Sequence, residues 1–125
     1  MRTVLVVDDE DGVISSIEQA LEHLECQLIT TTDPHQALRI VEAGSIDLLI
    51  TDLFMPSMDG ATLLRRSREI QPGLKVVLTT GVASDQQLRR WRARREVIIS
   101  KPWLDEEFLE AVTRALMRDP ETLLH

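Results

Sequence analysis

The chain has one cysteine, fewer basic than acidic residues and no long hydrophobic run, and each of these features argues against a class of protein. Cys26 has no second cysteine with which to form an internal disulfide, so we do not expect a disulfide-stabilised secreted fold. The first apolar run, residues 4–7, is far too short for a membrane span or a signal-peptide core. The net charge of −7 disfavours general binding to polyanions. We therefore expect a reduced, cytoplasmic protein that has no membrane segment and does not bind nucleic acid directly.

The length and the apolar content of the chain are those of one compact domain. It has 125 residues, of which 43% are hydrophobic, enough for a sizeable core. No repeat, linker or low-complexity stretch interrupts it. Only the end, where Asp119 and Pro120 follow Arg118, is typical of a chain leaving a fold. We expect residues 1–118 to form the domain and residues 119–125 to be a C-terminal tail or the start of a linker.

Short apolar runs alternate along the chain with segments in which apolar residues recur at helical spacing. The runs predict strands at residues 3–7, 26–31, 46–50, 75–78 and 97–99. The periodic segments predict helices at residues 13–24, 34–43, 61–70, 84–94 and 104–116. Strands that alternate with helices are joined by right-handed crossovers and lie parallel in one sheet. The sequence therefore predicts a doubly wound α/β domain.

Polar residues follow four of the five predicted strands within two residues of the strand end. They are Asp8 and Asp9 after the first strand, Asp52 after the third, Thr79 and Thr80 after the fourth, and Ser100 and Lys101 after the fifth. Because the carboxyl ends of parallel strands meet at one edge of a sheet, and ligands bind outside it, we expect these side chains to gather there. Three carboxylates, a hydroxyl group and an ammonium group would form a site for a divalent cation and a phosphoryl group.

Each of these residues also has a simpler interpretation. Asp8 and Asp9 begin an acidic run that a solvated loop could explain. Asp52 could cap a turn, although an unpaired carboxylate at the end of an apolar strand is costly to bury. Lys101 could be a surface lysine, although it follows an apolar strand. The residues taken one by one leave both interpretations open.

The same residues carry the motifs of a known family. The chain resembles the CheY-like receiver domain of two-component response regulators at Asp8-Asp9, at residues 52–60 (DLFMPSMDG), at Thr80-Gly81 and at Lys101-Pro102. These motifs occur in the family's order and span essentially the whole chain. The resemblance implies a flavodoxin-like, three-layer (βα)5 fold with a five-stranded parallel sheet in the order 2-1-3-4-5.

The resemblance implies a role for each acidic residue. Asp52 would be the phosphoacceptor, whose carboxylate attacks a phosphohistidine of a partner protein. Asp9, together with Asp8 mainly through water, would bind Mg²⁺ with Asp52 and the backbone carbonyl of Phe54. The ion would offset negative charge on the transferred phosphoryl group.

The resemblance also implies a catalytic role for two residues that contact the phosphoryl group. Lys101 would bind one phosphoryl oxygen, and a cis peptide bond to Pro102 could aim its ammonium group into the site. Thr80 would donate its hydroxyl group to another oxygen and pull the following loop inward. We choose Thr80 rather than Thr79 because Gly81 behind it leaves room for the phosphoryl group. Thr79 should then face the core or a helix.

The function implied by the resemblance is a phosphorylation switch in a phosphorelay. We expect a binding module rather than an enzyme, one that catalyses only its own phosphorylation and dephosphorylation. Its partner would be a sensor histidine kinase or a phosphotransfer protein. One alternative is a Mg²⁺-dependent phosphohydrolase that acts on a small molecule through an aspartyl phosphate, although no histidine lies near the expected site. A second alternative is a receiver-like interaction domain that works without phosphorylation.

Two features bear on how long the signal lasts and how it leaves the site. Ile98 stands three residues before Lys101, where the family usually has Tyr or Phe, and the chain has no tyrosine at all. We therefore doubt that the signal travels by the usual aromatic route. Phe54 and Val82 are apolar residues that flank the path of a hydrolytic water in the family, so we expect a long-lived acyl phosphate.

The predicted fourth helix locally reverses the charge of the chain. Arg89, Arg90 and Arg92 surround Trp91, and Arg94 and Arg95 follow where the family usually has a Gly-Ala pair. The arginines could simply be solvated and pair with Glu96 and other carboxylates. They could instead dock an acidic protein partner or a C-terminal output domain, with Trp91 as a buried anchor. The fourth helix, fifth strand and fifth helix could also pair two copies of the chain.

Overall fold

Five strands and five helices alternate along the chain in the computed structural model, which describes residues 1–81 and 84–118. The strands are β1 (Arg2–Val7), β2 (Cys26–Thr31), β3 (Leu48–Asp52), β4 (Lys75–Thr80) and β5 (Val97–Ser100). The helices are α1 (Asp11–Ala20), α2 (Pro34–Ala43), α3 (Gly60–Ile70), α4 (Asp85–Ala93) and α5 (Asp105–Leu116). None of these helices has both the length and the apolar content needed to cross a bilayer. Val82 and the expected tail, residues 119–125, lie outside the described residues.

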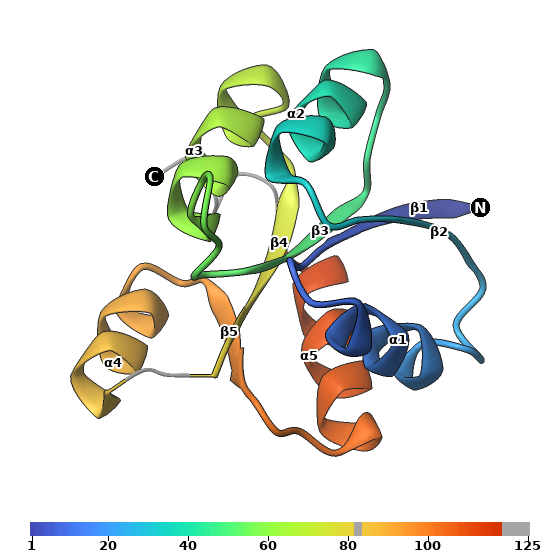
Figure 1. The fold of residues 1–125 in the computed structure, drawn as a ribbon. Coiled ribbons are helices and arrows are strands. Elements are labelled where there is room, and N and C mark those ends of the chain that lie inside the picture. Colours follow the sequence, from blue (N-terminus) through green and yellow to red (C-terminus); the bar gives the residue numbers. More distant parts are fainter. Residues whose placement is uncertain (82–83, 119–125) are drawn as a thin grey trace.

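The strands form one parallel sheet in the order β2-β1-β3-β4-β5. The helices α1 and α5 cover one face of the sheet, and α2, α3 and α4 lie on the other (Figure 1). This arrangement confirms the predicted doubly wound, flavodoxin-like fold and its strand order. The carboxyl ends of β1, β3, β4 and β5 therefore lie along one edge of the sheet.

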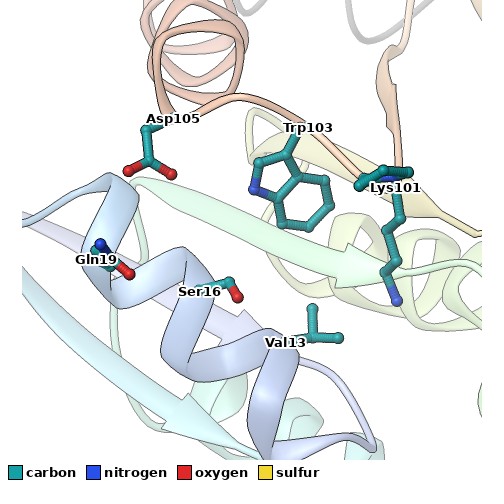
Figure 2. Close-up of a pocket in the computed structure, with 7 residues that line it drawn as sticks. Val13, Ser16, Gln19, Lys101, Trp103 and Asp105 are labelled. Atoms are coloured by element: carbon teal, nitrogen blue, oxygen red, sulfur yellow. The ribbon is translucent and has the colours of Figure 1, made fainter.

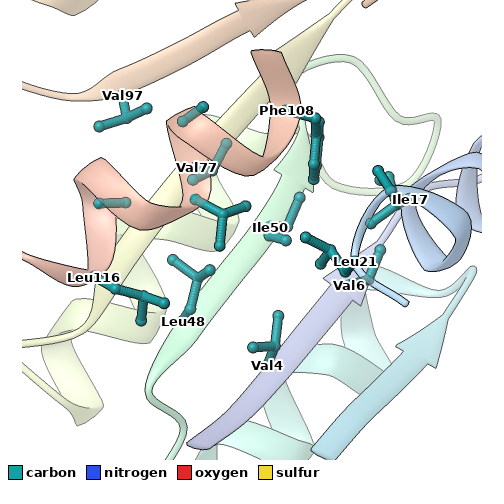
Figure 3. Close-up of a cluster of buried hydrophobic side chains, with 14 of the residues drawn as sticks. Val4, Val6, Ile17, Leu21, Leu48, Ile50, Val77, Val97, Phe108 and Leu116 are labelled. Atoms are coloured by element: carbon teal, nitrogen blue, oxygen red, sulfur yellow. The ribbon is translucent and has the colours of Figure 1, made fainter. Parts of the chain in front are cut away.

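Alternate residues of the strands point to opposite faces and build two hydrophobic clusters. On the side of α1 and α5, Val6 and Ile50 are in register across the sheet and pack in one cluster with Phe108 of α5 (Figure 3). On the other side, Leu5 and Leu49 are in register and pack in the cluster beneath α2 and α3. Both faces of the sheet are covered, which explains why its strands read as continuous apolar runs.

The C-terminal ends of three elements differ from the prediction by two residues or more. The helix α1 ends at Ala20 instead of Leu24, because the chain turns there and the N–H of Leu24 donates to the carbonyl of Leu21 at 2.9 Å. Both leucines still pack on the cluster beneath α1, which explains their helical spacing. The strand β3 ends at Asp52 and β4 at Thr80, two residues later than predicted, because both strands remain paired with β-sheet neighbours to these points.

The end of α5 is tied to the start of β4. The ammonium group of Lys75 donates a hydrogen bond of 2.6 Å to the backbone carbonyl of Leu116, the last residue of α5. This contact satisfies one of the carbonyl groups that a helix end leaves unpaired, and it complements the negative end of the helix dipole. The C-terminal end of α5 is therefore fixed beside the amino end of β4.

Candidate functional site

Three carboxylates meet at the carboxyl edge of the sheet. Asp8 directly follows β1, Asp9 comes next, and Asp52 is the last residue of β3. One carboxylate oxygen from each residue lies within 4.8 Å of the others. Asp8 and Asp52 are buried, whereas Asp9 is exposed. The structure brings together the acidic residues that the sequence pattern predicted for this edge, and a solvated acidic loop does not explain the buried Asp8.

Lys101 reaches the same carboxylates from the end of β5. Its Nζ lies 3.1 Å from Oδ2 of Asp8 and 3.4 Å from Oδ2 of Asp52. The backbone N–H of Lys101 donates to the carbonyl of Thr80 at 2.7 Å, and the peptide bond between Lys101 and Pro102 is cis. With a side chain only 21% exposed and two carboxylate partners, Lys101 is not an ordinary surface lysine.

Burial and neighbouring charges change the proton affinity of these groups. Burial raises the pKa of the Asp52 carboxyl group above its ordinary value; the charge of Lys101 opposes the rise, and that of Asp8 adds to it. For Lys101, burial favours the neutral form, but hydrogen bonding to Asp8 and the charges of both carboxylates outweigh it, so the pKa of Lys101 is raised. Lys101 therefore stays positively charged at neutral pH beside the carboxylates.

One oxygen of Asp52 has no partner within the described residues. This atom, Oδ1, is buried and accepts no hydrogen bond from them. A buried carboxylate oxygen left without a partner is costly, and a hard divalent cation that takes oxygen ligands would satisfy it. With one oxygen each from Asp8 and Asp9 close by, the acidic cluster could hold a metal ion.

The two threonines at the end of β4 are buried and point to opposite sides of the sheet. Thr79 is in register with Ile99, which packs on the cluster beneath α1 and α5. Its Oγ1 has no hydrogen-bond partner within the described part of the chain. Because successive side chains of a strand alternate, Thr80 points to the other side, at the end of β4 beside Lys101. Thr79 thus faces the core, while Thr80 lies at the carboxyl edge.

The turn after Asp52 is held close to it by Gly60. The backbone N–H of Gly60 donates to the carbonyl of Leu53 at 2.8 Å. A Cβ atom at position 60 would collide with the backbone carbonyl oxygen of Asp52 and would lie 2.9 Å from Cα of Leu53. Only glycine allows this approach. Within the turn, Phe54 exposes 55% of its surface, and Asp59 caps α3.

Comparison with known proteins decides the family. The family described as "Response regulator receiver domain" matches residues 4–113. The chain belongs to this family. The response regulator receiver protein CpdR of Brucella abortus is 28% identical to this receiver over 118 residues, which cover 94% of this chain and 98% of CpdR. The structure also resembles the crystal structure of the signal receiver domain of an HD domain-containing protein from Pseudomonas fluorescens Pf-5, with a TM-score of 0.80 and 32% sequence identity. The aligned region covers 92% of this chain and 94% of that one.

Some relatives of this receiver are much longer proteins. Sensor kinase CckA of Brucella abortus is 38% identical over 85 residues, which cover 66% of this chain but only 9% of CckA. CpdR, in contrast, is matched over nearly its full length. Receivers related to this chain thus occur both alone and within larger proteins, and this chain is a receiver domain of the two-component signalling type.

The receiver contains a buried ion pair that the sequence did not reveal. Arg68 of α3 and Glu96, directly before β5, form a bidentate pair in which Nη2 of Arg68 lies 3.1 Å from Oε1 of Glu96. Nε of Arg68 also donates to the carbonyl of Leu74 at 3.1 Å. The expectation that Glu96 pairs with the arginines of α4 is therefore wrong. The two partners are 28 residues apart, and no periodic pattern connects them.

In this receiver Ile98 fills a core position beneath α4. It is buried in the cluster that includes Leu78, its neighbour in register on β4. Leu88 and Trp91 of α4 pack against the same cluster. An enclosed aliphatic side chain thus occupies the position where the family usually has an aromatic one.

A pocket of about 310 Å³ lies beside Lys101, between α1 and the connection from β5 to α5. Figure 2 shows the indole ring of Trp103 between Lys101 and the start of α5, facing Val13 and Ser16 of α1. Trp103 packs on Phe108, with their ring centroids 4.7 Å apart. The polar and charged side chains of this lining come from Ser16, Gln19, Lys101 and Asp105.

Proposed function

We propose that this receiver is a phosphorylation switch whose acceptor is Asp52. A carboxylate oxygen of Asp52 attacks the phosphorus atom of a phosphohistidine, so that an O–P bond forms while the P–N bond breaks and its electron pair returns to the imidazole. The observation that best supports this role is the setting of the Asp52 carboxylate. Its buried Oδ1 has no hydrogen-bond partner within the described residues, and its Oδ2 lies 3.4 Å from the ammonium group of Lys101.

Two residues are proposed to contact the phosphoryl group. Lys101 already lies among the carboxylates, and it would replace part of its contact with Asp52 by a charge-assisted hydrogen bond to a phosphoryl oxygen. Thr80, the last residue of β4, would donate its hydroxyl group to another phosphoryl oxygen. Because the chain leads from Thr80 into α4, this contact would pull on the start of that helix.

Mg²⁺ is the proposed cofactor, because the acidic cluster has the oxygen donors that this ion prefers. Asp8, Asp9 and Asp52 would hold it together with the backbone carbonyl of Phe54. When bound, the ion offsets the negative charge that the carboxylates and the phosphoryl oxygens share. Asp9, the exposed member of the cluster, would approach the ion from the solvent side.

A sensor histidine kinase or a phosphotransfer protein is the proposed phosphoryl donor. The domain would act in the cytoplasm as a binding module and would catalyse only its own phosphorylation and dephosphorylation. A contact with an acidic partner or a C-terminal output domain is proposed through Arg89, Arg90, Trp91 and Arg92 on α4. Pairing of two copies through α4, β5 and α5 belongs to the same proposal, and it is supported by the exposed apolar side chains of Leu109 and Met117 on and after α5.

Phosphorylation by a small-molecule donor tests the proposed acceptor. The purified domain is incubated with acetyl phosphate and Mg²⁺, and its intact mass is measured. We expect one added phosphoryl group, which is lost in Asp52→Asn and when EDTA removes the metal. Asp11→Asn is the matched control, because Asp11 is an exposed acidic residue near the site but outside the cluster, and this variant should still be phosphorylated. A phosphorylated Asp52→Asn variant would contradict the assignment.

A further inference from the structure

A groove between α3 and α4 has charged walls and apolar contacts. The volume of this groove is about 360 Å³. Its walls include Leu64, Arg65, Arg68 and Glu69 from α3, and Trp91 and Arg94 from α4 and its C-terminal end. None of these residues takes part in the proposed phosphorylation chemistry.

The arginines of this groove are not equally neutralised. Arg68 is paired with Glu96. Arg65 and Arg94, in contrast, form no ion pair with any carboxylate in residues 1–81 and 84–118, although the charge of Arg65 contributes to the lowered pKa of Asp59. The guanidinium group of Arg94 lies over the ring of Trp91, 4.9 Å from the ring centroid. Stacking of this kind leaves the N–H groups at the edge of the guanidinium plane available to a carboxylate.

These cations belong to a larger basic patch on an acidic chain. Five arginines lie between residues 89 and 95, whereas the net charge of the whole chain is −7. Within the described ranges, none of these five arginines forms an ion pair. Glu96, the carboxylate that follows them in the sequence, is bound by Arg68 instead. A patch of unpaired positive charge attracts an acidic partner and repels a basic one.

The groove also offers apolar contact, which charge alone would not provide. Trp91 is half-buried and packs on the core beneath α4, and Leu64 of α3 is a buried member of the same core cluster. An apolar side chain laid against these two residues would be removed from water. Trp and Arg are the residues that most often dominate binding energy at protein interfaces. The groove is therefore suited to a ligand that combines negative charge with an apolar residue.

We propose that the α3–α4 groove docks an acidic peptide segment of a partner protein. One apolar side chain of the segment packs on Leu64 and Trp91, and its carboxylates pair with Arg65 and Arg94. Glu69, the acidic residue on the groove wall, repels any peptide carboxylate that lies beside it. This repulsion favours one of the two chain directions in which the peptide could lie along the groove. This inference rests on the proposed partner surface of α4 and narrows it to one side of that helix.

A random library of 12-residue peptides displayed on phage is the probe, because it assumes no sequence. The library is selected on the wild-type domain, the enriched peptides are synthesised, and their Kd values are measured by fluorescence anisotropy. We expect acidic peptides with at least one apolar residue, whose Kd rises with salt concentration. Enrichment of neutral or basic peptides, or no enrichment, would overturn the proposal.

Two matched double variants then locate the binding site. Arg65→Glu with Arg94→Glu reverses two charges on the groove, whereas Arg66→Glu with Arg89→Glu reverses two exposed charges of the same helices outside it. We expect the first pair to raise Kd about tenfold, or about 1.4 kcal/mol, and the second less than about threefold. Melting temperatures show that both variants are folded. If the first is not, Arg65→Gln with Arg94→Gln replaces it, with a smaller expected loss.

The pattern of loss separates the groove from the outer surface of α4. An equal loss of peptide affinity in both double variants would mean that the peptides are attracted to positive charge without specificity, and it would overturn the proposal that they bind in the groove. Loss in the Arg66 and Arg89 variant alone would also overturn it, while leaving the proposed partner surface on α4 intact. Loss of binding by all peptides in Trp91→Ala, with the fold retained, would add support for the apolar contact.

Discussion

The helices α4 and α5 flank the last strand of the sheet, yet they are attached to the domain very differently. The helix α5 buries five of its 12 residues, which are Phe108, Ala111, Val112, Ala115 and Leu116. The helix α4 buries none of its nine, and only Leu88 and Trp91 are partly buried against the core. In Figure 1, α4 lies at the margin of the domain, whereas α5 lies along the sheet beside α1.

This difference indicates which part of the receiver can move at low cost. Buried apolar surface stabilises a fold by about 25 cal/mol per Å², so a helix that buries little surface is held weakly. The strand β4 ends at Thr80, and the next helix along the chain is α4. A displacement of Thr80 would therefore reach the helix that resists it least. We expect the output to involve a shift of α4 over Ile98 rather than the rotation of an aromatic side chain.

The largest expected effect comes from emptying the core beneath α5. Phe108→Ala removes a fully buried ring and should lower the free energy of unfolding by about 3–5 kcal/mol. Trp91→Ala removes a larger but half-buried side chain and should cost only about 1–2 kcal/mol. Urea unfolding followed by circular dichroism measures both. Equal losses would show that α4 is anchored as firmly as α5.

The second largest effect is expected from the ion pair next to α4. Glu96→Gln leaves the largely buried guanidinium group of Arg68 without its charged partner, which should cost about 2–3 kcal/mol. The control is Glu69→Gln, an exposed change on α3 that should stay within about 0.5 kcal/mol of wild type. The same unfolding measurement applies. A loss no larger than that of the control would mean that the pair does not hold the C-terminal end of α4.

The caps of α3 and α4 differ in charge and should differ in pH dependence. Asp59 caps α3, and hydrogen bonds from the side chain and backbone of Thr62 lower the pKa of Asp59 below its ordinary value of 3.8. Ser84 caps α4 in a reciprocal arrangement with Gln87, which has no charge. Replacing either cap by alanine should cost about 1 kcal/mol near neutral pH.

The pH dependence follows from the direction of the Asp59 pKa shift. Because the folded state lowers this pKa, the contribution is complete above the unfolded-state value and is lost as the pH falls through the folded-state value. Thermal unfolding between about pH 7 and about pH 3 should therefore show a shrinking difference between wild type and Asp59→Ala. The difference between wild type and Ser84→Ala should stay constant. A constant difference for Asp59→Ala would contradict the charged cap.

The smallest expected effect is a gain in stability at the end of α4. Arg95 has a φ of 62°, a left-handed conformation that glycine adopts without the cost that a side chain adds. Arg95→Gly should raise the free energy of unfolding by about 0.5–1 kcal/mol. Arg92→Gly, inside α4, should lower it by about 1 kcal/mol. If thermal unfolding shows a loss at position 95 as well, the side chain of Arg95 supports the helix end.

Features that depend on local patterns could be predicted from the sequence. Apolar runs and helical spacing were sufficient for the order of the elements, because both faces of a parallel sheet are buried. Asp8, Asp52 and Lys101 meet because each lies at the carboxyl end of a strand in the same sheet, so their proximity follows from the topology alone. The family resemblance added the strand order.

Features that depend on contacts between distant segments could not be predicted. Arg68 and Glu96 form an ion pair only because α3 packs against the segment before β5. Neighbouring residues with the same chemistry also separate, since Asp8 is buried and Asp9 is exposed. The close approach of Gly60 to the backbone of Asp52 had a partial signal, because an Asp-Gly pair before a periodic apolar segment is typical of a helix start.

The hydrogen bond from Lys75 to Leu116 fixes where anything attached after α5 would begin. Lys75 starts β4 and Thr80 ends it, so the two ends of this six-residue strand are about 17 Å apart. The C-terminal end of α5 therefore lies at the end of the sheet opposite to Asp52. The proposed phosphorylation site at Asp52 and the C-terminal end of α5 are thus separated by about the length of a strand. A following domain could sense Asp52 only by reaching back along the molecule or through a helix that spans this distance.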